Sequence, residues 1–353
     1  MATPPQETPA TLGFHMPAEW RQHVATWLTW PKDPETWPDR VSQVEEIYIQ
    51  MIAALTPHET VNLLVDDPAT EHAVRERCTF ASASNLRFHH IPTVDSWIRD
   101  YGPNFLVDGR DGTAFNDWIF NAWGNKYETL KHDNGIPLFL EPQLKMRRFE
   151  PGIVLEGGAI DVNGAGCVLT TEQCLLNPNR NPHLNKNEIE EYLKIFLGVS
   201  KVLWLGEGIV GDDTDGHIDD IARFVGPNMI VCALEEDPED ANYELLQDNL
   251  ERLESMTDVN GGPFEIITLP MPGVVGGTST DTRNLDRLPA SYANFYIANN
   301  VVLAPVFGHA NDQRAVETLQ SVFSNRRVVP INCEPLVWGM GTIHCVTQQQ
   351  PQP

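Results

Sequence analysis

Short apolar runs alternate along the chain with longer segments in which apolar residues recur periodically. The short runs are rich in Val, Ile and Leu, which predicts buried strands. In the longer segments apolar residues return every three or four positions, which predicts helices that bury one face. A strand, a helix and a second strand in succession predict parallel neighbours in one sheet. The chain has five such successions, at residues 24–65, 61–92, 166–206, 228–270 and 300–333.

Predicted β-hairpins precede several of these units. Their turns contain Asn or Gly, which tolerate the positive φ that tight turns need. The hairpins are predicted at residues 159–171, 220–234 and 294–305, with a longer-turned one at 104–118. Five copies of one ββαβ unit favour a closed, radially repeated α/β array over an ordinary open α/β sheet. No linker or break in composition divides the chain, so we expect residues 1–353 to form a single domain.

The composition limits the partners of the protein. With a formal net charge of −25, the chain lacks the basic surface that phosphates require, so we expect no nucleic-acid partner. The N-terminus shows no signal peptide, and no apolar run is long enough to cross a membrane. The six cysteines form no C-x-x-C pair, which favours free thiols in a reducing compartment. We therefore expect a cytoplasmic protein, with a homo-oligomer as an open alternative.

Four polar clusters fall at matching points, each just before or inside the hairpin of its unit. They contain Asp100, Glu156, the pair His217 and Asp219, and Cys345. In a radial array, equivalent positions of different repeats converge on the axis. We therefore expect these side chains to meet in one pocket, although they are far apart in the sequence.

Cys345 is the candidate nucleophile in this pocket. It lies in a run that resembles a strand, where neighbouring side chains point to opposite faces, so His344 is a poor candidate for its base. His217 is the better candidate, with Asp219 two positions away on the same face. Carboxylates repel a thiolate, and a cationic planar substrate would resolve this conflict. A guanidinium gripped by paired carboxylates would expose its central carbon to Cys345, whether His217 or the substrate itself activates the thiol.

A metal site is the weaker interpretation of the same residues. The stretch 212–220 superficially resembles a calcium loop, but Gly211 and Ala222 occupy the two key ligand positions. Zinc bound by His217, Asp219 and Cys345 is conceivable but lacks helical ligand spacing. The sequence therefore favours a site without a metal.

Motifs along nearly the whole chain resemble agmatine deiminases of the guanidino-modifying, or pentein, superfamily, which also holds the bacterial peptidyl-arginine deiminases. The motifs are FHMPAEWRQHVATWLTWP, WIRDYGP, FNAWGNKY, LEGGAIDVNG, DTDGHIDDIARF, SYANFYIANN and GTIHCVTQQQP. The resemblance implies a five-bladed pseudo-symmetric α/β propeller, the pentein fold. It also implies hydrolytic deimination of agmatine, a small cationic guanidino substrate, to N-carbamoylputrescine and ammonia in putrescine biosynthesis. No metal or organic cofactor is implied.

The resemblance further implies a role for each candidate residue. Cys345 would form an amidino-thioether intermediate. His217 would protonate the departing ammonia and then activate water, with Glu156 orienting the imidazole. Asp100 and Asp219 would bind the guanidinium of the substrate.

The substrate is less tightly specified than the chemistry. Thr342 stands where many relatives have Asn, which weakens the assignment to agmatine and leaves free or peptidyl arginine as an alternative. Those substrates need basic residues at the pocket mouth, and Arg99 would point away from the pocket if it lay in a strand beside Asp100. Trp97 and Trp123 either flank the aliphatic chain of the substrate or belong to the core.

Two other classes of protein fit less well. A papain-like thiol hydrolase needs its cysteine at the start of a helix, and the QQQPQP tail after Cys345 leaves no room for a long one. A binding module without catalysis would make Cys345 incidental.

Overall fold

The computed structural model describes residues 7–80, 85–276 and 287–353. Residues 1–6, 81–84 and 277–286 lie outside these ranges. The expectation of no signal peptide rests partly on residues 1–6, and the single-domain prediction covers residues 1–353, so both extend beyond the described residues. Within the described ranges the strands form five separate sheets. No helix in these ranges is long and apolar enough to cross a bilayer.

All five sheets follow one plan, which is the predicted ββαβ unit. Two strands pair antiparallel, and a crossover then adds a third strand parallel to the second. The strands of the second to fifth units are β4 (Asn104–Val107), β5 (Thr113–Asn116) and β6 (Arg147–Phe149); β7 (Asp161–Val162), β8 (Cys167–Thr171) and β9 (Lys201–Leu205); β10 (Ala222–Gly226), β11 (Met229–Leu234) and β12 (Glu265–Pro270); and β13 (Tyr296–Ile297), β14 (Val301–Val306) and β15 (Arg327–Asn332).

The first unit joins the two ends of the chain. Its sheet has the strand order β16 (Gln348–Pro351), β1 (His23–Thr29), β2 (Thr60–Val65) and β3 (Leu86–His90). Strand β16 runs antiparallel to β1, so the last strand of the chain completes the sheet that the first strand begins. Closure of the five sheets into a complete propeller stays a prediction.

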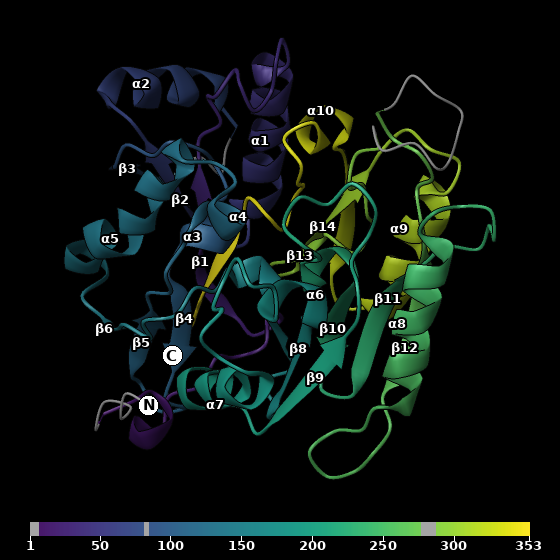
Figure 1. Cartoon of the computed structure of the whole chain (residues 1–353). Helices are drawn as coiled ribbons and strands as arrows, with labels where there is room; N and C mark the ends of the chain where they lie inside the picture. Colours follow the sequence, from purple (N-terminus) through teal and green to yellow (C-terminus); the bar gives the residue numbers. More distant parts are fainter. Residues whose placement is uncertain (1–6, 81–84, 277–286) are drawn as a thin grey trace.

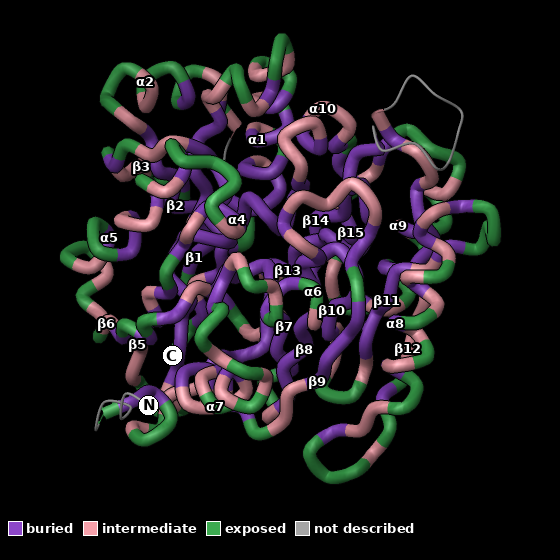
Figure 2. The backbone as a smooth tube through the Cα atoms, viewed as in Figure 1, coloured by how far each residue is buried: buried purple, intermediate pink, exposed green. Residues whose placement is uncertain are grey.

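Helices occupy the crossovers and surround the sheets. They are α1 (Val41–Leu55), α2 (Pro68–Arg77), α4 (Ala122–Asn125), α5 (Ile136–Leu144), α6 (Glu172–Leu175), α7 (Lys186–Leu197), α8 (Tyr243–Ser255) and α9 (Asp312–Val322), with α3 (Ile98–Tyr101) and α10 (Glu334–Val337) in other connections. In Figure 1, α2, α5, α7 and α8 lie around the outside, while the strands lie toward the interior. Figure 2 shows the same division, because burial is concentrated in the strands and exposure in the outer helices.

Helix α7 shows how local sequence sets these boundaries. The side chain of Asn185 accepts from the backbone N–H of Glu188 (3.2 Å), and the Glu188 carboxylate accepts from the backbone N–H of Asn185 (2.9 Å), which forms a capping box. Gly198 ends the helix with φ of +65°, a conformation that glycine adopts without strain. Between these caps the buried stripe consists of Ile189, Leu193, Phe196 and Leu197.

The succession at residues 61–92 does give parallel neighbours, because β2 pairs with β3. Its prediction as a unit of its own is wrong, because β2 and β3 belong to the first sheet. The missing unit is the second one, for which the sequence predicted only the hairpin at 104–118. Its third strand, β6, is a short polar run with little apolar signal, and Pro142 interrupts the pattern of α5. The number of units is nevertheless five, as predicted.

A network of buried charges lies where the units meet. The carboxylate of Glu19, which is 6% exposed, contacts a set of donors from four different units. They are Arg99 (3.4 Å), Arg223 (2.9 Å), His344 (2.8 Å) and the backbone N–H of Ile297 (2.8 Å). Arg223 also pairs with Asp161 of β7, so all five units reach this network. Buried ions need such partners, because taking a charge out of water is costly.

Glu19 is therefore expected to be essential for stability. Burial alone would raise its pKa, but Arg223 and the other donors outweigh burial and hold the pKa well below its usual range. Replacing Glu19 with Ala leaves two guanidinium groups with fewer partners, and should lower the free energy of unfolding by about 3–5 kcal/mol. Urea unfolding at pH 7 measures this loss.

The matched control is Glu236→Ala, which removes an exposed ion pair with Arg314 and should cost at most about 1 kcal/mol. A carboxylate with a depressed pKa stabilises the fold above the unfolded-state pKa, about 4.3 for Glu. That contribution is lost as the pH falls through the folded pKa. The difference between the wild type and Glu19→Ala should therefore shrink in acid. Equal losses for the two variants would contradict the assignment.

Candidate active site

The structure places the five side chains predicted to share a pocket, Asp100, Glu156, His217, Asp219 and Cys345, close to one another. Of these five, Asp100 and Cys345 line the cavity of the site, while Glu156, His217 and Asp219 are buried beside it. Each lies just before the first strand of its unit, in α3, beside the 3₁₀ turn η4 (Gly157–Ala159), at the 3₁₀ turn η5 (Ile218–Asp220), or in the turn before β16. Gly158 lies among them, and its N–H donates to Asp100 Oδ1 at 2.9 Å. A Cβ at Gly158 would lie 2.6 Å from His217 Nδ1 and 3.1 Å from Asp219 Oδ2, so only glycine fits there.

The local structure around Cys345 differs from the prediction. Residues 341–347 form a turn and not a strand. The alternation of side chains along a strand therefore does not explain why His344 and Cys345 point in different directions. His344 is instead held between two carboxylates, with Nδ1 2.7 Å from Asp219 Oδ2 and Nε2 2.8 Å from Glu19 Oε2. Burial, together with nearby Arg223, lowers its pKa. Both ring nitrogens of His344 thus lie within hydrogen-bond distance of carboxylates. These contacts, and not the strand geometry expected from the sequence, make His344 a poor candidate for the base of Cys345.

Arg99 and Asp100 are likewise in a short helix, α3, and not in a strand. Their side chains still diverge. Arg99 donates to the backbone oxygen of His344 (3.2 Å) and to Gln349 Oε1 (2.7 Å), and does not line the cavity of the site. Arg99 therefore has no contact with the cavity through which it could recognise a substrate carboxylate.

Cys345 lines a cavity of about 500 Å³ and is itself 7% exposed. Its Sγ lies 3.7 Å from Asp219 Oδ2 and 3.1 Å from the side-chain nitrogen of Asn294. Burial and the carboxylates of Asp219, Asp220 and Asp100 raise the pKa of the thiol well above its ordinary value. This environment favours the protonated thiol, and a bound cation would favour the thiolate.

The two carboxylates beside the thiol differ in their surroundings. Asp100 accepts from Gly158 and, through Oδ2, from Trp123 Nε1 at 2.9 Å. Burial, opposed by His217 and aided by Asp219, raises the pKa of Asp100 to about 6. Asp219 Oδ1 is buried and has no hydrogen-bond partner among the described residues. A buried acceptor without a donor is costly, so this oxygen suits a ligand that donates N–H groups.

His217 is positioned by an acidic loop that precedes it. The carboxylate of Asp212 accepts from the backbone N–H groups of Gly216 (2.8 Å) and His217 (3.1 Å). Gly216 has φ of +83°, which a tight turn of this kind requires. Asp212 belongs to the stretch that resembles a calcium loop, and its carboxylate shapes the turn that carries His217.

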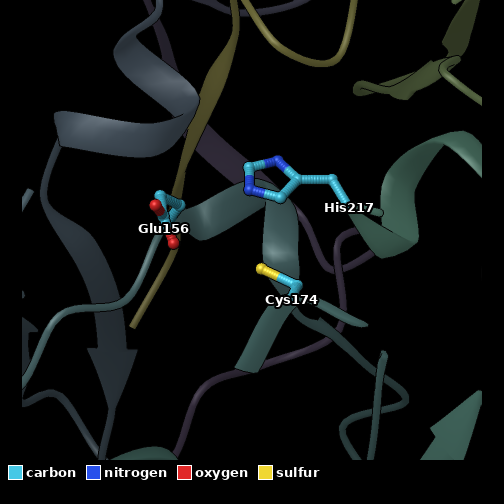
Figure 3. Close-up of side chains that lie close together, drawn as sticks. All are labelled: Glu156, Cys174 and His217. Atoms are coloured by element: carbon cyan, nitrogen blue, oxygen red, sulfur yellow. The ribbon is translucent and has the colours of Figure 1, made fainter. Parts of the chain in front are cut away.

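Figure 3 shows His217 with its imidazole extending toward Glu156 and the thiol of Cys174 beside both. Their ligand atoms lie within 4.8 Å of one another. His217 Nε2 and Glu156 Oε2 are buried without hydrogen-bond partners in the described part of the chain, while Glu156 Oε1 accepts from Arg180 at 2.7 Å. Burial alone would lower the pKa of His217, but Asp100 and Cys174 outweigh it and raise the pKa well above its ordinary value.

These three side chains are the ones in the described ranges whose spacing suits a metal ion. The zinc set considered from the sequence, His217 with Asp219 and Cys345, is not among them. The guanidinium of Arg180 already neutralises Glu156, which weakens the attraction for a second cation. The raised pKa of His217 also opposes the neutral imidazole that a metal requires.

Comparison with known proteins places the chain in a family. A family model described as Porphyromonas-type peptidyl-arginine deiminase matches residues 15–351. The chain belongs to this family. It is 37% identical over 363 residues to an agmatine deiminase of Ectopseudomonas mendocina, with 98% of each sequence covered. It is also 37% identical over 373 residues to an agmatine deiminase of Medicago truncatula, again covering 98% of each.

A solved structure of the agmatine deiminase of Enterococcus faecalis superposes with a TM-score of 0.91 at 34% identity, covering 98% of both chains. This match confirms the pentein fold that the sequence motifs implied. Membership of the Porphyromonas-type deiminase family also confirms the resemblance on which the sequence analysis relied.

In this family member both candidate tryptophans line the cavity and also pack in the hydrophobic core. Trp97 donates to Asp95 at 2.9 Å and Trp123 to Asp100 at 2.9 Å. Trp123 has φ of +52°, and the preceding Ala122 has φ of +56°. Left-handed backbone at such residues is strained, and here it accompanies the contact between the indole and Asp100.

The sequence analysis missed Asn294 and Asp220. Asn294 lies within the motif SYANFYIANN and directly precedes the first strand of the fifth unit, so the positional rule that found the other clusters also indicates it. Asp220 follows Asp219 and is buried, and burial together with the charge of Asp219 raises its pKa well above the ordinary value. It contributes to the acidic surroundings of Cys345.

Replacing Asp100 with Asn should lower the pKa of His217, because Asp100 is the carboxylate that most favours the imidazolium. Hydrogen–deuterium exchange at the imidazole C2 position, followed by mass spectrometry across a pH series, measures this pKa in the His217 peptide. The control is Asp248→Asn, which removes an exposed carboxylate elsewhere. An unchanged titration of His217 in Asp100→Asn would show that the two groups are not coupled.

Proposed function

We propose that this chain hydrolyses the guanidinium group of agmatine to N-carbamoylputrescine and ammonia, through a covalent amidino-cysteine intermediate. The observation that supports it best is the lining of the cavity at Cys345. Aromatic rings and acidic side chains line this cavity, and among the described lining residues there is no Lys or Arg. The acidic residues are Asp33, Glu35, Asp95, Asp100, Glu128 and Asp213.

This charge distribution favours agmatine over arginine. Both substrates carry a guanidinium, but agmatine carries an ammonium at its far end and no carboxylate. A carboxylate among these acidic groups would be repelled, and like charges placed together cost several kcal/mol. The basic residues that recognition of free arginine would need do not line the described part of the cavity. Peptidyl arginine, which is neutral at that end, lacks the attraction that an ammonium gains.

The guanidinium binds between Asp100 and Asp219. Oδ1 of Asp219, which has no hydrogen-bond partner among the described residues, accepts one of its N–H groups. Its positive charge offsets the carboxylates that raise the pKa of Cys345, so the thiol releases its proton to solvent. The thiolate then forms a C–S bond with the central carbon. His217, protonated because of its raised pKa, donates a proton to the departing nitrogen, the C–N bond breaks and ammonia leaves.

The second half of the reaction reverses these roles. Neutral His217 accepts a proton from water while the water oxygen forms a C–O bond with the amidino carbon. The C–S bond breaks and its electrons return to Cys345 as thiolate. The thiolate takes up the proton of the new hydroxyl group, which leaves neutral N-carbamoylputrescine and the Cys345 thiol. Glu156, beside His217, keeps the imidazole in place. Trp97 and Trp123 flank the aliphatic chain of the substrate.

Ammonia release from agmatine, arginine and an arginyl peptide tests the substrate. We expect kcat/KM for arginine to be lower than for agmatine by about 100-fold or more, since the carboxylate meets like charges. Cys345→Ala should release no ammonia above the uncatalysed rate from any of the three. Faster turnover of arginine or of the peptide than of agmatine would overturn the substrate assignment.

The covalent step has its own test. Brief mixing with agmatine, acid quenching and peptide mass spectrometry should show an adduct on the Cys345 peptide with the mass of agmatine less ammonia. Cys345→Ser should carry no such adduct, while Cys333→Ser, which alters a buried cysteine that does not line the cavity, should retain it. Steady ammonia release with an adduct on another residue would exclude Cys345 as the nucleophile.

A further inference from the structure

Four of the five units place a candidate functional side chain just before their first strand. The fifth unit places Asn294 at this point, two residues before β13, and its side chain is completely buried. Its side chain contacts the turn that carries Cys345, and it also forms a hydrogen bond with the carboxylate of Asp220. A buried amide needs hydrogen-bond partners inside the protein, so the partners of Asn294 indicate which part of the structure it supports.

The orientation of the Asn294 amide is fixed by its neighbours. Its Oδ1 accepts from the hydroxyl of Thr342 at 2.7 Å and from the backbone N–H of His344 at 2.9 Å. A backbone N–H can only donate, so the oxygen must face His344. The amide nitrogen is thereby directed at Cys345, with Nδ2 3.1 Å from Sγ.

We propose that Asn294 is a catalytic residue that donates a hydrogen bond from Nδ2 to the thiolate of Cys345. The thiolate exists twice in the reaction, when sulfur attacks the guanidinium carbon and when it leaves during hydrolysis. In both steps the N–H group meets a developing or full negative charge on sulfur. Hydrogen bonds to an ionised acceptor are stronger than those to a neutral one, so the amide favours the thiolate over the thiol.

The other side chains near the sulfur cannot supply this effect, although the backbone N–H of Thr342 also donates to the sulfur and favours the thiolate together with the amide. The carboxylates of Asp219, Asp220 and Asp100 oppose a negative sulfur. Asp219 Oδ2 at 3.7 Å and Asn294 Oδ1 at 3.5 Å can accept from the thiol, but that interaction is lost with the proton. The Asn294 amide is the side-chain donor to Sγ within the described residues, and it is neutral at every working pH. It therefore supports the thiolate without adding a charge of its own to the site.

This inference rests on the proposed role of Cys345 as a nucleophile, but its test does not require agmatine. The measurement is the rate at which iodoacetamide alkylates Cys345 in the substrate-free protein, followed by mass spectrometry of its peptide over a pH series. Iodoacetamide reacts with the thiolate, so the rate at a fixed pH reports the thiolate fraction. Each variant is also assayed for ammonia release from agmatine.

Asn294→Ala and Asn294→Asp should each slow alkylation of Cys345 by about tenfold or more, and lower kcat with agmatine by a similar factor. Asn294→Asp keeps an acceptor for Thr342 and His344 while losing the N–H group, so it preserves the turn. Asn294→Ala adds no charge, so it separates the lost donor from an added carboxylate.

The matched control is Thr342→Val, which removes the hydroxyl that supports Asn294 but leaves the amide beside sulfur. It should retain alkylation within about threefold of the wild-type rate, because its loss is one neutral hydrogen bond. Alkylation at the wild-type rate in folded Asn294→Asp and Asn294→Ala would overturn the inference and leave Asn294 as a support for the turn. Equal slowing of Cys345 alkylation in Thr342→Val would also overturn the inference. If the wild type released no ammonia from agmatine, the proposed function would fail, whereas the alkylation comparison would still decide the role of Asn294.

Discussion

The structure depends on one buried carboxylate, that of Glu19, whose charge must be matched by donors from four of the five units. Two guanidinium groups, an imidazole and a backbone N–H converge on it, and Arg223 extends the network to Asp161. Buried ions are tolerated only when their partners are in place, so the five sheets cannot shift independently of one another. His344 then connects this network to Asp219, which lies beside the thiol of Cys345. The same charges that hold the units together therefore also orient the site.

The carboxylates around Cys345 need the positive charge of a bound cation. Burial, together with neighbouring carboxylates, raises the pKa of both Cys345 and Asp100, so each group is disfavoured in its reactive, ionised form. A guanidinium favours the ionised form of both Cys345 and Asp100, because it supplies positive charge and N–H donors at the same place. Asp219 Oδ1, which is buried and has no hydrogen-bond partner in the described part of the chain, is the clearest acceptor for such a donor. Substrate binding and activation of the nucleophile are in this way one electrostatic event.

The repeat also explains how distant residues come to act together. Asp100, Glu156, Asp219, Asn294 and Cys345 each lie just before the first strand of a different unit. Asp100 of the second unit and His217 and Asp219 of the fourth lie against Gly158 of the third, where no side chain could be accommodated. A fold of this kind collects one polar group per repeat, and small changes at these points alter the chemistry without altering the sheets. The strained backbone at Ala122 and Trp123 lies beside this centre, where tertiary contacts maintain it.

Sequence alone determined what depends on local periodicity and on position in the repeat. The apolar stripes and caps of helices such as α7, the buried parallel strands, and the gathering of Asp100, Glu156, His217, Asp219 and Cys345 all followed from patterns within short windows. Tertiary structure decided the rest. Strand β6 is too short and polar to give a signal, and β16 completes the first sheet by pairing with β1, more than 300 residues away. The turn around Cys345, the capture of His344 by two carboxylates and the contact of Asn294 with sulfur arise from hydrogen bonds between units. No periodicity records those bonds, because their partners lie tens to hundreds of residues away.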